Sequence, residues 1–435
     1  MDRATVYQLR ALMEYEAARA APPPTFPMLP DVPGGRYTDP RFAELERDQL
    51  WRKSWLFAGH MDEIPQHGCF KLWETAGQPI VLVHARSGEV NAFYNTCSHR
   101  GAPVVTQEKG RRARLTCKYH GWVYDDEGKL VSVRDPEDFV DLDFSCRSLR
   151  QVRCERYGKL IFVNFNADAP TLTEWLGPIA QEWEEFRFDA TRLVDHYIWD
   201  LDCNWKIAME ANMEVYHVPN IHPSTVALGL DHRRNVNSLY PYGHGRMIAP
   251  GWEKKEGENY RAANVGNFQR PEIEGVGEIG RTCTQSYNLF PNWVSPLGPT
   301  GYFVLNFWPN GPTRSKMEVW WFGPDWGEGP RPAFWDATIT YLNSVLEEDT
   351  EFGKWIQKSQ ESYGFEGVPL SYQEARIYHW HQQADAMIGR DRIPDELRVA
   401  PVIGADWIVP NDPRLEEPSL QAAAELALSR SGRLP

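Results

Sequence analysis

The sequence contains 435 residues, of which 42% are hydrophobic and 13% are aromatic. This composition is typical of a globular protein, and the length allows for roughly two or three domains with separate hydrophobic cores. Sixty acidic residues against 46 basic ones give a formal net charge of −14. Because this charge repels a nucleic-acid backbone and an anionic membrane surface, we expect a small molecule or another protein as the partner.

The cysteines and the N-terminus indicate the cellular compartment. Seven cysteines are spread over the whole chain, which does not suit a disulfide scaffold and favours a reducing, cytoplasmic environment. Residues 1–20 carry acidic residues among the apolar ones, unlike a signal peptide or a membrane anchor. Apolar runs such as 160–165 and 302–308 are strand-sized, well below the roughly 20 residues that span a bilayer, so no membrane association is expected.

The first elements along the chain are predicted to be helices. A helical pattern at the N-terminus ends at residues 21–35, where several prolines prevent a helix from continuing and mark a linker. A second helix is predicted over 39–55, because Phe42, Leu45 and Leu50 contribute to an apolar face of approximately helical spacing.

From residue 69 to residue 165 the pattern changes to short strands. Turn-forming pairs such as Ser87-Gly88 and Glu127-Gly128 separate these strands, as is typical of a small antiparallel β domain. The predicted strands cover 69–74, 78–85, 89–94, 113–117, 129–133 and 159–165.

The remainder of the chain alternates between strands and helices. Strands are predicted over 193–203, 282–290, 300–308 and 316–323, and helices over 204–217 and 332–361. We therefore expect an N-terminal helix and linker over 1–45, a β domain over 46–165, and a larger α+β domain over 166–435.

Two Cys/His pairs lie within the β domain, on loops between predicted strands. Cys97 and His99 are followed, after 17 residues, by Cys117 and His120. Zinc accepts two thiolates and two imidazoles in a closed tetrahedral site. The alternative is a [2Fe–2S] cluster in which two histidines replace two cysteines on one iron. Each loop here carries one Cys and one His, so both sulfurs can reach one iron and both nitrogens the other. The pattern resembles the Rieske iron–sulfur family.

A second group of metal-binding residue types follows in residues 204–224. Glu210, Glu214 and His217 are spaced at i, i+4 and i+7, which predicts that they share one helix face. Pro219 is expected to end this helix, so that His222 returns beside His217 from the following turn. Two imidazoles and one carboxylate form the facial triad of non-haem Fe(II) oxygenases, which leaves positions open for O2 and substrate.

The third ligand of such a triad has to come from another part of the sequence. Asp349, in the predicted helix 332–361, is our choice. It has several acidic neighbours that compete for this role, namely Glu347, Glu348 and Glu351.

Taken together, these motifs resemble the α subunit of the Rieske non-haem iron aromatic-ring-hydroxylating oxygenases. The resemblance runs from Trp51 and Trp55, through NTCSHRG and CKYHGWVYDDEGKL, to NWK with the E-x-YH-x4-H motif and a late ED-x6-IQ segment. It implies a [2Fe–2S] cluster and one Fe(II) in each subunit. By position, the implied cluster ligands are Cys97, His99, Cys117 and His120, and the implied iron ligands are His217, His222 and Asp349.

The resemblance also gives a role to Glu214. In the family an acidic residue at this position connects a Rieske histidine of one subunit to an iron-binding histidine of the next, and the corresponding Rieske residue here is His120. Two features depart from the usual pattern. The bridge is a glutamate instead of the commoner aspartate, which weakens an assignment to aromatic substrates. The usual E-N-F becomes Glu210-Ala211-Asn212, in which Asn212 could face the pocket.

Other residues with suitable chemistry receive simpler interpretations. His379 and His381 are expected to have surface or packing roles, because no carboxylate pattern lies near them. His232 is a candidate for the substrate entrance, while Arg233 and Arg234 are by default a solvated charge pair. Trp320 and Trp321 are expected in the core or an interface.

The family resemblance implies a complete functional hypothesis. The chain would be the terminal oxygenase component, an α+β protein with an antiparallel Rieske domain and a helix-grip catalytic domain, in which a curved antiparallel sheet surrounds a long helix. Electrons would come from a separate reductase, with or without a ferredoxin, as in the family that the chain resembles. We expect a homotrimer, with or without a small β subunit, acting with O2 on an organic, aromatic substrate.

Two alternatives remain open at this stage. One is a monooxygenase that demethylates a quaternary ammonium compound. The other is a Rieske electron carrier without catalytic activity, which would not need the set formed by His217, His222 and Asp349.

Overall fold

The computed structural model describes residues 1, 3–251, 270–416 and 420. These residues divide into two compact units, which we describe separately. Unit 1 combines Met1–Leu50 with Trp175–Pro435, and unit 2 is the continuous segment Trp51–Glu174. Among the described residues, no helix is both long enough and apolar enough to cross a membrane.

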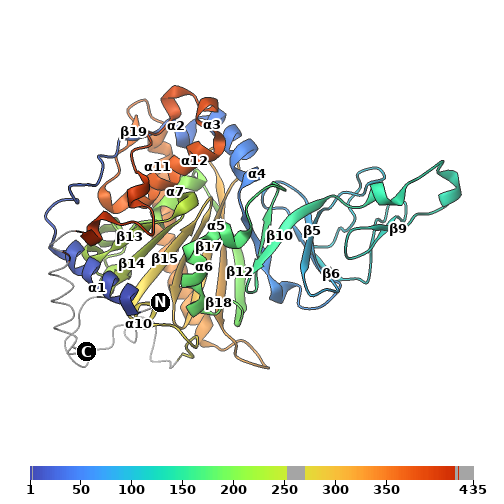
Figure 1. Cartoon of the computed structure of the whole chain (residues 1–435), viewed down its shortest axis with the longest axis horizontal. Helices are drawn as coiled ribbons and strands as arrows, with labels where there is room; N and C mark the ends of the chain where they lie inside the picture. The colour runs from blue at the N-terminus through green and yellow to red at the C-terminus, as the bar shows by residue number, and fades with distance from the viewer. Residues whose placement is uncertain (2, 252–269, 417–419, 421–435) are drawn as a thin grey trace. The chain divides into compact units, whose positions relative to one another are not determined.

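Unit 2 is an antiparallel β domain (Figure 1). Its larger sheet has seven strands, in the order β2-β11-β10-β5-β4-β3-β6, and its smaller sheet has the order β7-β8-β9. The strands are β2 (Leu56–His60), β3 (Cys69–Trp73), β4 (Ile80–His84), β5 (Val90–Tyr94), β6 (Lys109–Arg111), β7 (Leu115–Thr116), β8 (Val123–Tyr124), β9 (Leu130–Ser132), β10 (Gln151–Tyr157) and β11 (Leu160–Asn164). The predicted strands are present. The charged strand β10 lacks a clear apolar alternation and was not expected.

Unit 1 is built on a second antiparallel sheet of seven strands, with the order β12-β18-β17-β16-β15-β14-β13. Its strands are β12 (Thr191–Leu201), β13 (Val236–Leu239), β14 (Gly245–Pro250), β15 (Cys283–Leu289), β16 (Trp293–Gly298), β17 (Gly301–Pro309) and β18 (Ser315–Pro324). Long pairings of β12 with β18 and of β18 with β17 dominate it. Trp320 and Trp321 lie in its core, as expected.

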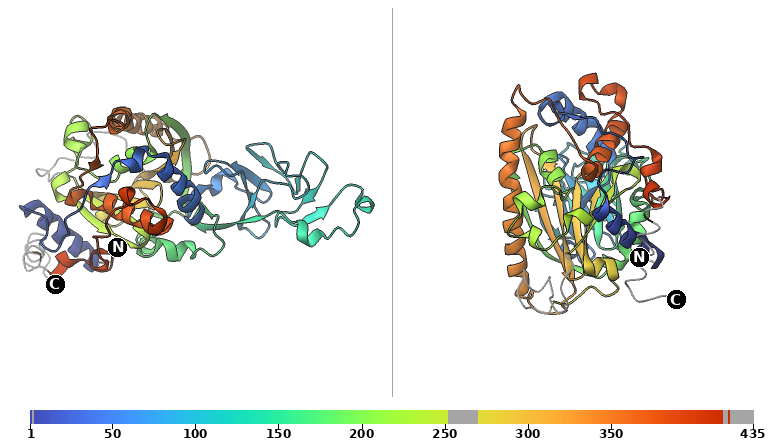
Figure 2. Two further views of the ribbon diagram at one scale, coloured as in Figure 1. Left: turned by 90° about the horizontal axis from the view of Figure 1, so that it is seen from above. Right: turned by 90° about the vertical axis from the view of Figure 1, so that its left-hand side faces the viewer.

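A long helix runs along the sheet of unit 1. Helix α11 (Phe334–Gln360) has 27 residues and lies on one face of the sheet (Figure 2). In the described part of the chain, the remaining α-helices of four or more residues are α1 (Arg3–Ala18), α2 (Gly35–Thr38), α3 (Pro40–Leu45), α5 (Leu172–Leu176), α6 (Pro178–Glu182), α7 (Trp205–Ala211), α8 (Val218–Ile221), α10 (Glu278–Thr282) and α12 (Ala375–Ile388). An antiparallel sheet with a long helix against it confirms the predicted fold class.

The N-terminal segment belongs to unit 1 and contributes to its interior. Strand β1 (Val32–Pro33) pairs with β19 (Gly367–Val368), the short strand that follows α11. This pairing leads directly into α2, whose Tyr37 is buried. The predicted helix 39–55 appears as α3, a π-helical turn over Glu46–Leu50, and the short α4 (Trp51–Lys53).

The predicted helix 204–217 is wrong in its extent. Helix α7 ends at Ala211, and the chain makes a turn before the short helix α8 begins at Val218. Pro219 lies in the first turn of α8, where its missing N–H is not needed, so it begins a helix instead of ending one. Glu210 therefore does not share a helix face with Glu214 and His217.

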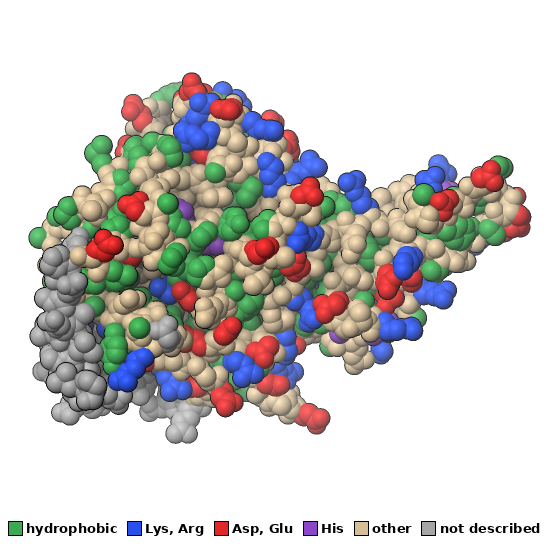
Figure 3. Space-filling model, in the orientation of Figure 1, with side chains coloured by type: hydrophobic (Ala, Val, Ile, Leu, Met, Phe, Trp, Pro, Cys, Tyr) green, Lys and Arg blue, Asp and Glu red, His purple; other side chains and the backbone are tan. Residues whose placement is uncertain are grey.

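Charged side chains are mixed on the molecular surface. Figure 3 shows acidic and basic side chains interspersed over the face in view, without a continuous region of either sign. A binding surface for a phosphate backbone usually appears as a basic patch or stripe.

Candidate active site

The first Cys/His loop of unit 2 follows β5 and is held by two backbone hydrogen bonds. The N–H of Cys97 donates to the carbonyl of Ala102 at 2.8 Å, and the N–H of Gly101 donates to the carbonyl of Cys97 at 2.9 Å. Gly101 has a φ of +75°, in the left-handed region that glycine adopts at little cost. The side chain of Cys97 is thereby turned into the buried core of unit 2.

The second loop, between β7 and β8, repeats this pattern. The N–H of Cys117 donates to the carbonyl of Trp122, and the N–H of Gly121 donates to the carbonyl of Cys117, both at 2.9 Å. Gly121 also has a φ of +75°. A Cβ added to either Gly101 or Gly121 would have no protein atom within 4 Å. The backbone angle therefore explains these glycines better than close packing does.

The candidate metal ligands of these two loops lie near one another. The rings of His99 and His120 are 4.5 Å apart between centroids. Burial raises the pKa of the Cys117 thiol, and the neighbouring Cys97 raises it further. Atom Nδ1 of His99 is buried without a hydrogen-bond partner among the described residues, which fits a nitrogen that binds metal.

The pairing of the donors fits a two-iron cluster. The thiol of Cys97 lies beside that of Cys117, and the ring of His99 lies beside that of His120. In a Rieske cluster both histidines bind one iron, which leaves the two cysteines for the other.

Two further residues surround the first loop. The hydroxyl oxygen of Tyr124 lies 3.2 Å from the sulfur of Cys97 and accepts a hydrogen bond from the N–H of Ser98 at 3.1 Å. Trp122 stacks on His99, with the ring planes 5° apart. Neither aromatic residue was singled out from the sequence, although both lie in the segment CKYHGWVY that carries the second pair.

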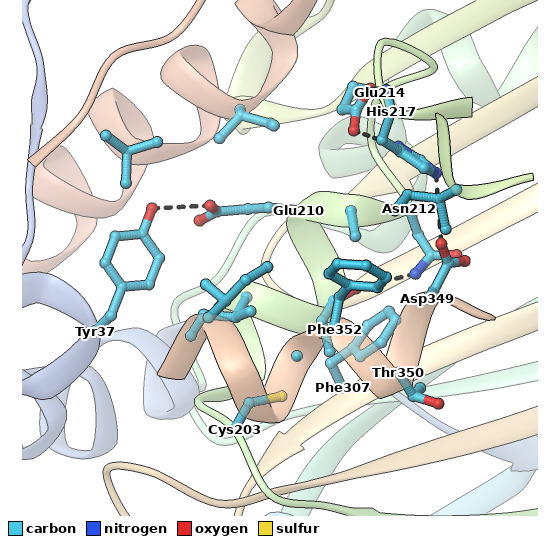
Figure 4. Close-up of a pocket in the computed structure, with 18 of the residues that line it drawn as sticks. Tyr37, Cys203, Glu210, Asn212, Glu214, His217, Phe307, Asp349, Thr350 and Phe352 are labelled. Carbon is cyan, nitrogen blue, oxygen red and sulfur yellow. Dashed lines mark hydrogen bonds and ion pairs between the residues drawn. The ribbon is translucent and has the colours of Figure 1, made fainter. Parts of the chain in front are cut away.

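Unit 1 contains a pocket between its sheet and two helices. The pocket has a volume of about 290 Å³ and lies between α7, α11 and strands β17 and β18 (Figure 4). Phe307 and Met317 are directly paired across β17 and β18, and both line it. Ile207, Leu346 and Phe352 add to its apolar wall.

Three candidate metal ligands meet at one end of this pocket. Among the described residues, His217, His222 and Asp349 form the one set whose donor atoms lie within 4.8 Å of one another. Atom Oδ1 of Asp349 is 2.9 Å from Nε2 of His222 and 3.4 Å from Nε2 of His217. His217 and Asp349 line the pocket, so a metal held there has access to a substrate.

A glutamate carboxylate contacts Nδ1 of each histidine, on the side of the ring away from Asp349. Oε1 of Glu214 is hydrogen-bonded to Nδ1 of His217. Oε2 of Glu348 lies 2.6 Å from Nδ1 of His222 and also accepts a hydrogen bond from the Thr225 hydroxyl at 2.9 Å. An imidazole that donates its Nδ1 proton to a carboxylate presents the lone pair of Nε2 to a metal. Glu348 was a competing ligand candidate on sequence grounds, but this supporting position was not foreseen.

The charges around these histidines favour a cation. Burial disfavours the charged form of His217, but hydrogen bonds to Asp349 and Glu214 outweigh burial and raise its pKa to about 10. Burial alone would raise the pKa of Asp349, yet the two imidazoles hold it below the ordinary value. The set therefore concentrates negative potential at one point, as a divalent metal site requires.

The other residues singled out from the sequence have varied positions. Asn212 lines the pocket, and its side-chain amide donates to the carbonyl of Ala208 at 2.9 Å. His379 and His381 are buried in α12, so the packing role holds and the surface role does not. His232 is not among the residues that line the described pocket. Arg234 forms ion pairs with two acids, Glu14 at 3.4 Å and Asp231 at 3.6 Å.

Comparison with known proteins identifies the family. The model of the Rieske [2Fe–2S] domain matches residues 54–148, and the model of the ring-hydroxylating α subunit catalytic domain matches residues 188–390. The glycine betaine monooxygenase oxygenase subunit of Chromohalobacter salexigens is 31% identical over 400 residues, which cover 82% of this chain and 86% of that protein. The chain belongs to the α-subunit family of Rieske oxygenases.

Other Rieske oxygenases match over different lengths. The biphenyl 2,3-dioxygenase α subunit of Rhodococcus jostii is 34% identical over 50% of this chain, so the chain spans about half of that relative, 48% of its length. A solved structure of a quaternary ammonium Rieske monooxygenase superimposes with a TM-score of 0.70 at 18% identity, covering 85% of this chain and all of the other. Naphthalene 1,2-dioxygenase from a Rhodococcus species gives a TM-score of 0.68 at 20% identity, covering 89% and 98%.

The cofactors of Rieske oxygenases fit the donors described above. The family combines a Rieske [2Fe–2S] domain with a catalytic domain for one mononuclear iron. The unpartnered Nδ1 of His99, and the pairing of thiol with thiol and of ring with ring in unit 2, suit the cluster. The compact set in unit 1 consists of two imidazoles and one carboxylate, the donor types of a mononuclear non-haem iron site.

Proposed function

We propose that this chain is the terminal component of an oxygenase system that uses O2 to oxidise a small organic molecule in the pocket of unit 1. The observation that carries the proposal is the convergence of His217, His222 and Asp349 on one point at the end of a largely apolar pocket. An electron carrier without catalytic activity has no use for such a set. When bound, the cluster supplies electrons singly, and the iron supplies open coordination positions for O2 and substrate.

In this proposal each ligand has a stated role. Cys97 and Cys117 bind one iron of the cluster, His99 and His120 bind the other, and His217, His222 and Asp349 bind the mononuclear iron. Glu214 and Glu348 accept the Nδ1 protons of the two iron-binding histidines, which fixes the orientation and the tautomer of each ring. Phe307, Met317 and Leu346, which are buried, exclude water from their side of the substrate.

We further propose that the protein works as a head-to-tail homotrimer, with or without a small β subunit. In such a ring the cluster-binding His120 of one subunit would meet Glu214 of the next, so that Glu214 links two metal-bound imidazoles. A separate reductase, with or without a ferredoxin, would supply the electrons in the cytoplasm. The hydrogen bond from His217 to Glu214 supports this arrangement. The two relatives compared above are likewise subunits, an oxygenase subunit and a dioxygenase α subunit, which supports a system of several components.

The substrate class can be narrowed by the pocket walls. Phe307 and Phe352 suit an aromatic ring or another apolar body. The second candidate function, oxidative demethylation of an ammonium compound, is supported by a different observation. Four acidic residues line the pocket, Glu210, Glu214, Asp349 and Glu374, whereas no Lys or Arg does so among the described residues. An anionic substrate would lack a charged partner there.

Metal content and oxygen consumption test this proposal. We expect about three irons per chain, two in the cluster and one in the mononuclear site. About two irons would indicate an electron carrier, and zinc in unit 2 would contradict the cluster assignment. With a reductase present, one compound from a panel of neutral aromatic molecules, aromatic acids and amines should stimulate O2 uptake in proportion to product. Iron-loaded protein that oxidises none of these classes would contradict the proposed function.

A further inference from the structure

The pocket of unit 1 has a second polar group that the candidate metal site does not use. The hydroxyl of Tyr37 donates to Oε2 of Glu210 at 2.8 Å. Atom Nε2 of His381 lies 3.0 Å from Oε1 of Glu210 and 3.2 Å from the Tyr37 oxygen. Tyr37 and Glu210 both line the pocket, and the side chain of Glu210 keeps 11% of its surface exposed. Its carboxyl group is therefore held in place at the pocket wall.

This polar group lies away from the candidate metal ligands. In Figure 4, Glu210 points toward Tyr37, while His217 and Asp349 lie on the other side of Phe352. Gln360, which also lines the pocket, is eleven residues beyond Asp349 on α11, a distance of about 16 Å along a helix axis. The pocket thus has two polar ends separated by apolar side chains.

Lys206 and Arg36 act on Glu210 through space, but neither donates a hydrogen bond to it in the described part of the chain. Glu210 has no Lys or Arg as a hydrogen-bond partner among the described residues, and the nearest buried cations are bound elsewhere. Arg36 pairs with Asp385 at 2.6 Å, and Lys206 pairs with Glu46 at 2.8 Å. In addition, Oε1 of Gln360 is a buried acceptor without a hydrogen-bond partner among the described residues.

We propose that the group formed by Glu210, Tyr37 and Gln360 is a specificity subsite that binds a protonated primary or secondary amine of the substrate. The N–H groups of such an amine would donate to the Glu210 carboxylate and to Oε1 of Gln360. The apolar body would lie against Phe307 and Phe352, with the carbon to be oxidised at the far end, beside His217 and Asp349. This inference rests on the proposed function, because it assumes that oxidation takes place at that end.

The protonation of Glu210 supports a site for an N–H cation. Burial raises the pKa of this carboxyl group to about 8, although Tyr37 and Lys206 lower it in part. Near pH 7 the empty site therefore holds a proton, which a bound ammonium group would displace. The charged and titratable groups that face Glu210 from the surrounding elements are Arg36 and Tyr37 of α2, Glu46, Lys206 of α7, Glu374, and His381 of α12.

Calorimetric titration of the anaerobic, iron-loaded protein tests the subsite with four probes that share one skeleton. These are 3-phenylpropylamine, 3-phenylpropan-1-ol, 3-phenylpropanoate and 3-phenylpropyltrimethylammonium. The amine should bind about tenfold or more tightly than the alcohol, because it makes charge-assisted hydrogen bonds. It should also bind more tightly than the quaternary ammonium, which has no N–H to donate. Repeating the titration in buffers of different ionisation enthalpy should reveal proton release with the amine and none with the alcohol.

Variants assign the preference to particular residues. Glu210→Gln should reduce the affinity ratio of amine to alcohol from about tenfold to near one. Glu347→Gln makes the same chemical change at an exposed position of α11 and should leave the ratio unchanged. Gln360→Leu should weaken amine binding more than alcohol binding, because a charge-assisted hydrogen bond is stronger than a neutral one, and should therefore lower the ratio. It therefore tests the subsite even if Glu210→Gln does not fold.

The outcomes separate this inference from the proposed function. Equal affinities for the amine and the alcohol, without proton release, would overturn the subsite even in an enzyme that oxidises another compound. So would a ratio in Glu210→Gln that matches the wild-type protein. Conversely, a clear amine preference in a protein that never consumes O2 would support the subsite and count against the oxygenase proposal.

Discussion

The two candidate metal centres of this chain are assembled in different ways. In unit 2, four donors come from two loops with the same backbone hydrogen bonds and the same left-handed glycine. In unit 1, three donors come from the irregular segment after α7 and from α11, which are more than a hundred residues apart in sequence. Carboxylates of Glu214 and Glu348 then orient the histidines.

This difference shows which interactions hold the candidate ligands of each centre in position. The loops of unit 2 position their ligands through the backbone, so the identity of the surrounding side chains matters less. The site in unit 1 depends on side-chain contacts between distant segments, so its geometry should be sensitive to substitutions at residues that never touch the metal. The following predictions test that contrast.

The largest expected effects come from removing one ligand in each unit. Asp349→Ala should abolish substrate-dependent O2 uptake while leaving the visible absorption and the reduced-state electron paramagnetic resonance signal of the cluster intact. Cys117→Ser should eliminate that absorption but retain about one iron per chain in unit 1. Loss of the cluster in Asp349→Ala, or retained turnover, would contradict the independence of the two centres or the role of Asp349.

Removing a carboxylate that orients a candidate metal ligand should have a smaller but clear effect on metal binding in unit 1. Glu348→Gln removes the carboxylate that orients His222, and such changes typically weaken metal binding by about 10–100-fold. The measurement is the iron affinity of unit 1, by competition with a chelator, in protein that keeps its cluster absorption. Glu347→Gln, on the same helix but exposed, is the matched control and should bind iron normally. Equal affinities in both variants would argue that Glu348 does not position His222.

The buried carboxyl group of Glu210 predicts a pH effect on stability. Its pKa of about 8 in the folded chain lies above the ordinary value of 4.5, so the folded state binds more protons than the unfolded state between these values. Its contribution therefore decreases as pH rises from 4.5 to 8, by at most about 1.4 kcal/mol for each pH unit. In Glu210→Gln the free energy of unfolding should fall less steeply between pH 6.5 and 8. Parallel slopes for the variant and the wild-type protein would refute this assignment.

The smallest predicted effect concerns the matching loops of unit 2. Gly101→Ala and Gly121→Ala each place a side chain at a φ of +75°, which costs about 1–2 kcal/mol. Because the two loops have the same backbone bonds, the two losses should be similar. Gly364→Ala, at an exposed glycine without a positive φ, serves as the control. Scanning calorimetry, which detects the unfolding of both units, measures all three, and unequal losses at Gly101 and Gly121 would show that the loops are not equivalent.

The sequence was sufficient to predict the parts whose signals are local. The Cys/His spacing and the short strands of unit 2 appear in consecutive residues, as does the long amphipathic helix that became α11. The turn after Ala211 was not predictable from spacing, because Glu210, Glu214 and His217 fit a helix pattern that the chain does not follow. Tertiary contacts of Glu210 with Tyr37 and His381 decide its direction instead.

Other parts depend on pairings that one sequence does not reveal. Helix α12 escaped prediction because its buried face includes Arg376, His379 and His381, which interrupt the apolar pattern. Among the acidic neighbours in α11, only the fold separates Asp349, which faces the two histidines, from Glu348 behind them and from exposed Glu347. These roles follow from the angle at which α11 packs, since consecutive residues point in different directions.

The contact between Tyr37 and its partners has a consequence for folding during synthesis. Unit 2 is one continuous segment, so all of its residues are available as soon as residue 174 has left the ribosome. Tyr37 can contact Glu210 only after 173 further residues have been synthesised, and it can contact His381 only after 344. Such distant contacts are slow to form, and domains tend to fold as units during translation. We therefore expect nascent chains to acquire a protease-resistant unit 2 first, while the N-terminal segment, with Tyr37, remains cleavable until nearly the whole chain has been made.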